Sequence, residues 1–232
     1  VASLAYVFRH EMSQAKEAAE AAVAKSEARG VEWSVLAYYY GASGDMQNAQ
    51  INLNKARSIE TFPARAMRLA GEVYRTAGQY EQAIKEFSSE TSLEEYPPGY
   101  RQRAMTYIQL DQWRAALSDL RKSASLNPLS ATTLSYLAYV EDHLGMTSAA
   151  DEHLKKAIKS KSRPAIVYSN SAAIKLARKD LSSALSEANK AIAAAWVNEK
   201  QLVLDGKGTR NWTPEQQNDI LTKGKAYGED GK

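Results

Sequence analysis

The sequence predicts an all-α protein made of stacked helical hairpins, a solenoid, because small residues and turn residues recur every 33 or 34 positions. One ladder holds the turn positions Gly44, Gly78, Asp111, Gly145 and Lys179. A second ladder holds Ala49, Ala83, Ala116, Ala150 and Ala184, and a third holds Ala37, Gly71, Ala104, Ala138 and Ala172. A fixed period of this length is typical of a repeat array in which each hairpin stacks on the next.

Apolar spacing within one period predicts two helices joined by a turn. In residues 64–90, apolar side chains recur at helical spacing before Gly78 and again after it. Gly78 is expected to end the first helix, since glycine is common just beyond a helix C-terminus. Gly71 and Ala83 are expected where the two helices cross, because a larger side chain at either place would force the helices apart.

The same register assigns the rest of the chain in order. We expect a partial repeat over residues 1–29, full repeats over 30–63, 64–96, 97–130, 131–164 and 165–196, and a tail over 197–232 with one short helix. Ala15 and Ala22 indicate the partial repeat, since they lie 34 residues before Ala49 and Ala56. Because the array begins inside a repeat and the chain begins at Val1, we expect a fragment of a longer protein.

One copy of the repeat carries an ordered set of residues that resembles a known family. The set in copy 64–96 is Met67, Ala70, Gly71, Tyr74, Gly78, Tyr80, Ala83 and Phe87. It resembles the tetratricopeptide repeat family, and the resemblance covers residues 30–196. The sequence departs from the family at Glu90 and Ser123, where alanine is usual, and at Lys175, where an aromatic residue is usual. The resemblance implies a right-handed superhelical solenoid that binds a protein or peptide in its groove.

The resemblance also implies which first-helix residues face the groove. The expected ligand-binding residues are Tyr38, Arg65, Arg68, Glu72, Arg75, Arg101, Met105, Ser135, Tyr139 and Asp142. Arg68 and Arg101 hold equivalent places in successive repeats, and a guanidinium group suits carboxylates, so we expect an acidic partner. The alternative is that these arginines pair inside the chain, with Glu72 or with the two glutamates at 94–95. The Lys and Asn residues of the family's clamp for peptide carboxylates are missing at these positions.

The tail carries a second and shorter pattern. Its residues are Arg210, Trp212, Thr213, Glu215, Ile220, Leu221, Gly224, Tyr227 and Gly231. The pattern resembles the lead-in to GHH-type nuclease domains of polymorphic toxins of the Rhs and teneurin kind. The family's catalytic Gly-His-His would follow, but the sequence has no histidine beyond His153, so no nuclease chemistry is assigned to the tail. The alternative is a capping helix that starts after Thr213, followed by a disordered end.

No motif in the sequence points to catalysis, so we expect that the protein is not an enzyme. The chain contains no cysteine, and His10, His143 and His153 have no partner ligands at metal-binding spacing. P-loop and nucleophile-elbow motifs are missing as well. We therefore expect no catalytic residue, no metal site and no cofactor. A net charge of +3 gives no indication of nucleic-acid binding, and no apolar run approaches a membrane span.

Three functions are consistent with these patterns. The one we favour is a protein- or peptide-binding scaffold that uses the groove of the array. The second is the non-catalytic repeat and linker region of a secreted toxin whose nuclease domain lies beyond this sequence. The third is an envelope receptor module, because residues 97–164 resemble repeats of bacterial outer-membrane phage-adsorption proteins. These resemblances suggest a bacterial envelope or secreted location, leave a cytoplasmic one open, and do not address the oligomeric state.

Overall fold

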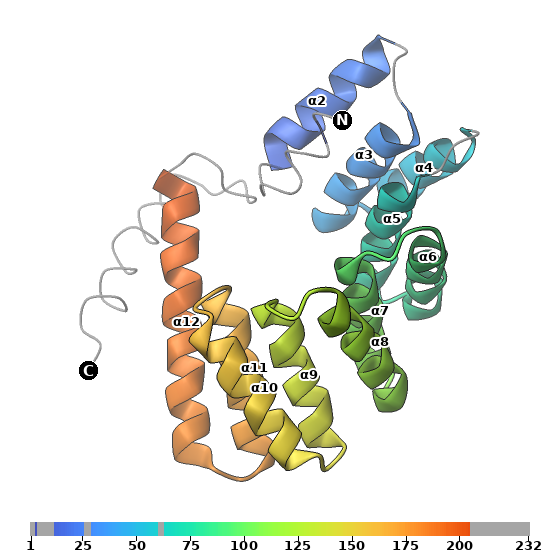
Figure 1. The fold of residues 1–232 in the computed structure, drawn as a ribbon. Coiled ribbons are helices and arrows are strands. Elements are labelled where there is room, and N and C mark those ends of the chain that lie inside the picture. Colours follow the sequence, from blue (N-terminus) through green and yellow to red (C-terminus); the bar gives the residue numbers. More distant parts are fainter. Residues whose placement is uncertain (1–2, 4–11, 26–28, 60–62, 205–232) are drawn as a thin grey trace. The chain divides into compact units, whose positions relative to one another are not determined.

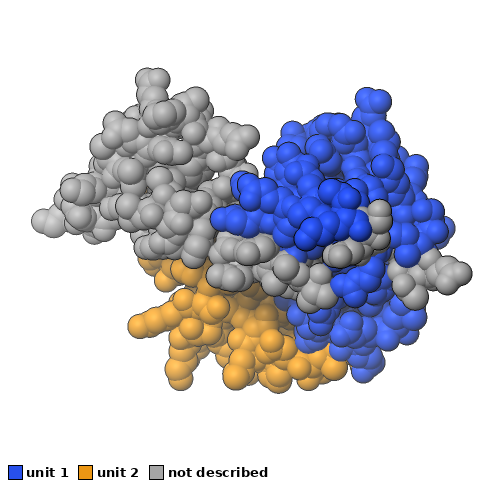
Figure 2. Space-filling model, turned by 90° about the horizontal axis from the view of Figure 1, so that it is seen from above, with its two compact units in different colours: residues 1–111 blue, residues 112–232 orange. Residues whose placement is uncertain are grey.

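The computed structural model describes residue 3 and residues 12–25, 29–59 and 63–204, with side chains described as far as residue 195. Every regular element in these ranges is an α-helix, which confirms the all-α prediction. The chain divides into two compact units, residues 1–111 and residues 112–232 (Figure 2). The boundary falls inside the expected repeat 97–130, between its two helices.

The first unit contains the hairpins that follow the partial repeat. Its described helices are α2 (Met12–Ala24), α3 (Gly30–Ala42), α4 (Met46–Arg57), α5 (Ala64–Thr76), α6 (Tyr80–Leu93) and α7 (Pro97–Gln109) (Figure 1). Helices α3 and α4 form one hairpin, and α5 and α6 form the next. Helix α3 also packs against α2 and α5, and α7 packs against α6. Each hairpin therefore contacts the elements before and after it, as in a repeat stack.

The second unit continues the same pattern. Its described helices are α8 (Trp113–Leu126), α9 (Ala131–His143), α10 (Thr147–Lys159), α11 (Pro164–Ala177) and α12 (Leu181–Leu204). Helices α9 and α10 form one hairpin and α11 and α12 the other, while α9 also packs against α8 and α11. Helix α12 has 24 residues and continues past position 196, where the sequence predicted the last repeat to end.

The turn within each hairpin is made by a residue in the left-handed region of backbone space. The predicted turn ladder has φ of 85° at Gly44, 73° at Gly78, 55° at Asp111, 78° at Gly145 and 63° at Lys179. The residue after the turn then donates its N–H to a carbonyl five residues back, as from Asp45 to Tyr40 at 2.9 Å and from Gln79 to Tyr74 at 2.9 Å. This bond closes a helix whose following residue is left-handed. The periodic glycines therefore mark helix ends, as the sequence predicted.

The two helices of a hairpin approach each other at the ladders of small residues. Within the hairpins that lie inside one unit, full burial is found at Ala37 and Ala49, at Ala83, and at Ala138 and Ala150. In α5, a Cβ added to Gly71 would lie 2.5 Å from the ring of Phe87, a fully buried side chain on α6. The close approach predicted at Gly71 is therefore a contact with the ring of Phe87.

Successive hairpins meet at a further position, where two departures from the family pattern are accommodated. Ser123 on α8 is fully buried, and its hydroxyl lies 3.2 Å from the hydroxyl of Thr133 on α9. Glu90 on α6 is also buried, and a Cβ added to Gly99 on α7 would lie 2.9 Å from its Oε2 atom. The larger residue in one hairpin is therefore matched by a compatible residue in the next.

Gly71→Ala is expected to lower the free energy of unfolding by about 1 kcal/mol or more relative to Gly41→Ala. Both changes remove a glycine from a helix, and the gain in helix propensity is at least as large at Gly71, in the middle of α5, as at Gly41, near the end of α3. The new Cβ would meet the Phe87 ring at 2.5 Å in the first variant and the Val73 side chain at 3.2 Å in the second. Urea denaturation followed by circular dichroism measures the difference. Equal stabilities of the two variants would contradict this packing.

Candidate binding surface

The predicted groove residues of the first unit lie on α3, α5 and α7 and differ widely in exposure. Arg65 is exposed, the side chains of Tyr38, Arg75, Arg101 and Met105 are half-buried, and Arg68 and Glu72 are buried. Arg68 and Arg101 lie on α5 and α7, two helices that contact each other. Because a buried side chain is not accessible to a partner, these residues do not present one open surface.

Arg68 is held inside the first unit by Glu90, contrary to the expectation that it faces an open groove. Its Nη1 donates to Glu90 Oε1 at 3.2 Å, and 7% of the Arg68 side chain and 1% of the Glu90 side chain are exposed. The guanidinium group also lies over the ring of Tyr96, 5.0 Å from the ring centre. The internal pairing that the sequence allowed is therefore present, and the carboxylate seen against Arg68 is that of Glu90, which the sequence analysis did not name as a partner.

A second ion pair lies one turn further along α5. Arg75 Nη2 donates to Glu72 Oε2 at 2.6 Å, so Glu72 has a partner inside the chain, although that partner is neither Arg68 nor Arg101. Tyr38 lies near the pair, and burial together with the negative charge of Glu72 raises the pKa of its hydroxyl. Since Arg68 and Arg75 each have a carboxylate partner inside the chain, the charges on α5 give little support to an acidic ligand.

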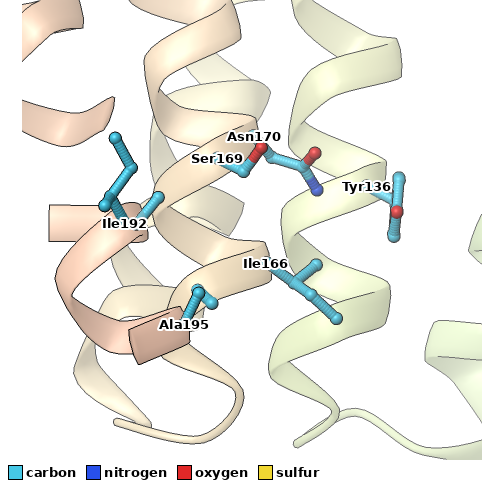
Figure 3. A pocket seen from close by; sticks show the side chains of 8 residues that line it. Tyr136, Ile166, Ser169, Asn170, Ile192 and Ala195 are labelled. Carbon is cyan, nitrogen blue, oxygen red and sulfur yellow. The ribbon is translucent and has the colours of Figure 1, made fainter. Parts of the chain in front are cut away.

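An open pocket of about 370 Å³ lies in the second unit between α9, α11 and α12 (Figure 3). Its lining consists of Tyr136, Ala165, Ile166, Ser169, Asn170, Ala191, Ile192 and Ala195. Tyr136 belongs to α9, the residues from 165 to 170 belong to α11, and the last three belong to α12. The wall is mostly aliphatic, with polar groups from Ser169 and Asn170 among the α11 residues.

The side chain of Asn170 is oriented by a hydrogen bond between two helices. Its Nδ2 donates to Ser135 Oγ on α9 at 3.0 Å, and the Ser135 hydroxyl in turn donates to the carbonyl of Thr132 at 3.0 Å. Ser135 is itself buried, so it positions Asn170 and does not line the pocket. Since the Asn170 amide group donates through its nitrogen, its carbonyl oxygen is available to accept a bond from a ligand.

The other two predicted groove residues of the second unit contact side chains of the chain itself. The ring of Tyr139 packs edge-on against Trp113, with the ring centres 5.9 Å apart. Asp142 accepts from Arg178 Nε at 2.8 Å. Neither residue lines the pocket, and their role as ligand-binding residues stays a prediction.

The chemistry of the pocket suits an apolar side chain with a polar backbone beside it. Ile166 and Ile192 supply aliphatic contacts, while Ser169 and Asn170 can form hydrogen bonds with groups next to that side chain. Small-ligand pockets of about 300–1,000 Å³ commonly combine an apolar wall with a few polar groups that fix orientation.

Part of this pocket follows from the register that the sequence analysis used. Ile166 and Ser169 occupy the places in repeat 165–196 that Arg65 and Arg68 occupy in repeat 64–96. Extending the groove positions by one more repeat would have found both residues. Ile192 and Ala195 were missed because they lie on a second helix, and groove positions were taken from first helices only.

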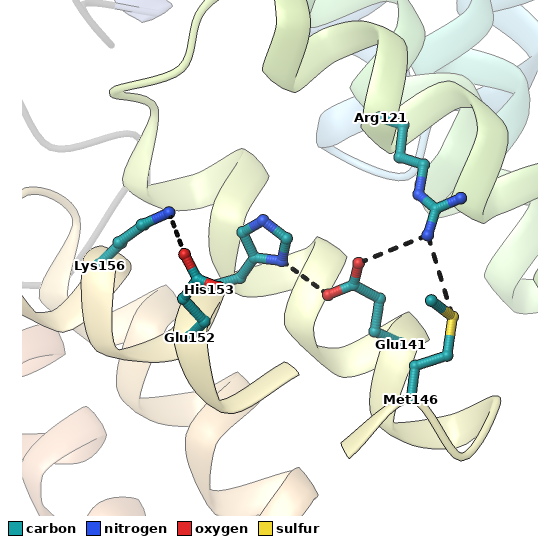
Figure 4. A network of polar contacts seen from close by, with 6 residues as sticks. All are labelled: Arg121, Glu141, Met146, Glu152, His153 and Lys156. Carbon is teal, nitrogen blue, oxygen red and sulfur yellow. Dashed lines mark hydrogen bonds and ion pairs between the residues drawn. The ribbon is translucent and has the colours of Figure 1, made fainter. Parts of the chain in front are cut away.

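A buried carboxylate connects α9 to α10 in the second unit (Figure 4). Glu141 Oε2 lies 2.7 Å from His153 Nδ1, and Arg121 on α8 approaches Glu141 Oε1 at 3.9 Å. Residue spacing along the sequence did not indicate this pair, because the fold brings Glu141 to His153 from the preceding helix. Among the residues that the structure describes, no group of three or more His, Cys, Asp or Glu side chains could hold a metal ion. The network therefore joins the two helices of the α9–α10 hairpin, and Arg121 approaches it from α8.

Comparison with solved structures identifies the class of fold. The chain is similar to YrrB, described as a tetratricopeptide repeat protein with an unusual peptide-binding site, at a TM-score of 0.56 and 19% identity over 83% of this chain and 98% of that chain. It is similar to a tetratricopeptide repeat protein from Parabacteroides merdae at a TM-score of 0.62 and 20% identity over 95% of this chain and 94% of that chain. It is also similar to MamA, at a TM-score of 0.54 and 20% identity over 69% of this chain and 95% of that chain. The protein has the tetratricopeptide repeat fold, as the sequence predicted.

The C-terminal part of the chain matches a separate family. Residues 184–232 match the GHH signature containing HNH/Endo VII superfamily nuclease toxin family, which confirms the resemblance of the tail. The match begins inside α12, earlier than the tail predicted at 197. The motif from Arg210 to Gly231, the expected short helix and His10 lie outside the described residues. No curated protein sequence matches the chain.

Across the described helices, none combines the length and the apolar character that crossing a membrane requires.

Glu90→Gln is expected to change how stability depends on pH. Burial raises the pKa of the Glu90 carboxyl to about 7, and the nearby charge of Arg68 opposes this only in part. Because the pKa in the unfolded chain is near 4.5, folding favours the protonated form. The contribution of Glu90 is therefore fully present below about pH 4.5 and is lost as the pH rises through about 7. Between pH 4.5 and pH 8, the free energy of unfolding of Glu90→Gln should therefore rise relative to that of the wild type by on the order of 1–3 kcal/mol.

Urea titrations at several pH values measure this difference. Glu81→Gln, an exposed change on the same helix, is the control and should follow the wild-type curve. Parallel pH profiles for wild type and Glu90→Gln would show that the Glu90 carboxyl does not titrate as described.

Proposed function

We propose that the protein is a protein- or peptide-binding scaffold and that the pocket between α9, α11 and α12 receives an apolar side chain of the bound segment. The observation that carries the proposal is an aliphatic wall beside an Asn170 amide that is held in place by Ser135. The fold supports it, because stacked repeats offer extended binding surfaces and a protein of the same fold, YrrB, is described as having a peptide-binding site.

The pocket also suggests the chemistry of the partner. Ile166 and Ile192 favour an aliphatic side chain such as leucine, isoleucine or methionine. The carbonyl oxygen of Asn170 can accept a hydrogen bond from the backbone N–H of the same segment. An acidic partner bound by Arg68 is not supported, because that side chain is buried against Glu90.

A second proposal is favoured by the family match at residues 184–232. In this proposal the chain is the non-catalytic repeat and linker region of a nuclease toxin, and the array docks or presents the toxin. The two proposals are compatible, because a groove that binds a partner protein can also direct an attached toxin to it. The catalytic His pair would then lie beyond the sequence, since no histidine follows His153.

Substitutions in the pocket are expected to weaken binding of a peptide selected from a random displayed library. Ile166→Asp should weaken it by at least about tenfold, because it replaces an apolar contact with a charge. Asn170→Ala should weaken it by about 3- to 10-fold, the effect of one lost hydrogen bond. Isothermal titration calorimetry with the selected peptide measures both effects.

The matched control is Lys155→Ala on α10, an exposed change in the same unit, which should bind as wild type does. Circular dichroism verifies that each variant is folded. If the selected peptide binds both pocket variants with unchanged affinity, the pocket is not its binding site.

The 232-residue chain is expected to leave plasmid DNA and RNA intact. The reason is that a GHH nuclease requires a histidine pair, and the last histidine of this chain is His153. Purified protein is incubated with plasmid and divalent cations, and nicking is read on an agarose gel. Cleavage that co-purifies with the chain from two different expression hosts would contradict this expectation.

A further inference from the structure

The last described hairpin carries an exposed apolar face. Leu181 and Leu185 on α12 are 67% and 64% exposed, and Leu176 near the end of α11 is 59% exposed. Leu181 and Leu185 are four residues apart in one helix and therefore lie on the same side of it. We call these three residues the leucine face. Large exposed apolar side chains that gather in one place usually mark a contact surface.

In the preceding repeat, two of these positions contact the hairpin that follows. Leu176 and Leu185 lie 34 residues after Asp142 and Asp151. Arg178, from the hairpin that follows those aspartates, donates to Asp142 Oδ1 at 2.8 Å and to Asp151 Oδ1 at 2.8 Å. A single side chain of the next hairpin thus contacts both positions, so they lie side by side, with 9% of the Asp142 side chain and 55% of the Asp151 side chain exposed.

The third position has a contact of this kind two repeats earlier, whereas Thr147, one repeat earlier, is exposed. Leu181 lies 68 residues, two repeats, after Trp113. The ring of Trp113 stacks on His143, with ring centres 3.6 Å apart, and packs edge-on against Tyr139. His143 and Tyr139 belong to α9, the first helix of the hairpin that follows α8. Each position of the leucine face therefore has a counterpart in an earlier repeat that contacts the following hairpin.

The chemistry of these places changes at the last hairpin. Aspartates that bind an arginine are replaced by leucines, so the covering segment must be apolar at the point of contact. Residues 205–232 follow α12 and contain the apolar side chains Trp212, Ile220 and Leu221. We propose that the leucine face is the docking surface for this segment, so that the nuclease-family region packs onto the end of the repeat array.

Two further observations support this occupant. The nuclease toxin family model spans residues 184–232, so Leu185 and the proposed docking segment belong to one family region. The lengths also fit. Leu185 precedes the end of α12 by 19 residues, which is about 29 Å of helix. Ile220 follows Leu204 by 16 residues, which can span up to about 53 Å of extended chain.

Cysteine pairs test the proposal directly, because the full chain contains no cysteine. The 232-residue protein carrying Leu185→Cys and Ile220→Cys is mildly oxidised, and a second protein with Leu185→Cys and Leu221→Cys samples a neighbouring position. The control carries Lys155→Cys, exposed on α10, together with Ile220→Cys. We expect an intrachain disulfide, at the monomer mass, to form at least about tenfold faster in one of the first two proteins than in the control.

Each of the other results would overturn the proposal. A product of twice the monomer mass would assign the leucine face to a second copy of the chain. Equal rates in all three proteins would show that the segment does not dock there.

A second measurement needs no cysteine. Leu181→Asp with Leu185→Asp should speed trypsin cleavage after Lys207 and Arg210 by about tenfold, because an undocked segment is open to protease. The helical circular dichroism signal shows that this variant is folded. An unchanged cleavage rate in the folded variant would also reject the docking. Neither measurement depends on peptide binding in the pocket, so the two ideas succeed or fail separately.

Discussion

A left-handed residue at every hairpin turn is the constraint on which the rest of the structure depends. It lets the chain reverse while the next N–H closes the helix that has just ended, as between Asp45 and Tyr40. The two helices can then run close together only where their side chains are small. Asp111 and Lys179 adopt this conformation without being glycine, at a cost on the order of 1 kcal/mol each, which the surrounding packing must offset.

Two of the buried carboxylates, those of Glu90 and Glu141, stand where another residue type is found in the best-matching repeats, and each has a specific compensation. Glu90 fits because Gly99 leaves room for it and Arg68 supplies the opposite charge. Glu141 lies two repeats after Tyr74, at the same repeat position, and is held by His153. A buried charge that loses its partner destabilises the fold, so each of these carboxylates depends on the neighbour that compensates it.

The fold could be predicted from the sequence because its determinants are local and repeat. The turn at Gly78 and the small residue at Gly71 have counterparts in each of the five full repeats. Because all five copies share one register, their individually weak signals support the same fold. The binding surface was harder to predict. The position of Arg68 within its helix predicted that its side chain faces the groove. Its burial depends on Glu90 on the neighbouring helix, and the position of Arg68 within its own helix gives no information about that residue.

The pocket was missed for a related reason. Ile166 follows from the register, whereas the orientation of Asn170 depends on a hydrogen bond to Ser135 in a different hairpin. Ile192 and Ala195 line the pocket from a second helix, and the sequence analysis had assigned the groove to first helices alone. Contacts between hairpins are therefore what the sequence pattern leaves undetermined.

Helix α12 belongs both to the last hairpin and to the region that matches the nuclease toxin family. A continuous helix fixes the rotation and the distance between the segments at its two ends. Each residue added to or removed from it turns everything downstream by about 100° and moves it by about 1.5 Å along the axis. The number of residues in α12 therefore determines the orientation of any rigid segment that follows the helix. A module attached to such an array would keep its orientation only if the number of helical residues stayed the same.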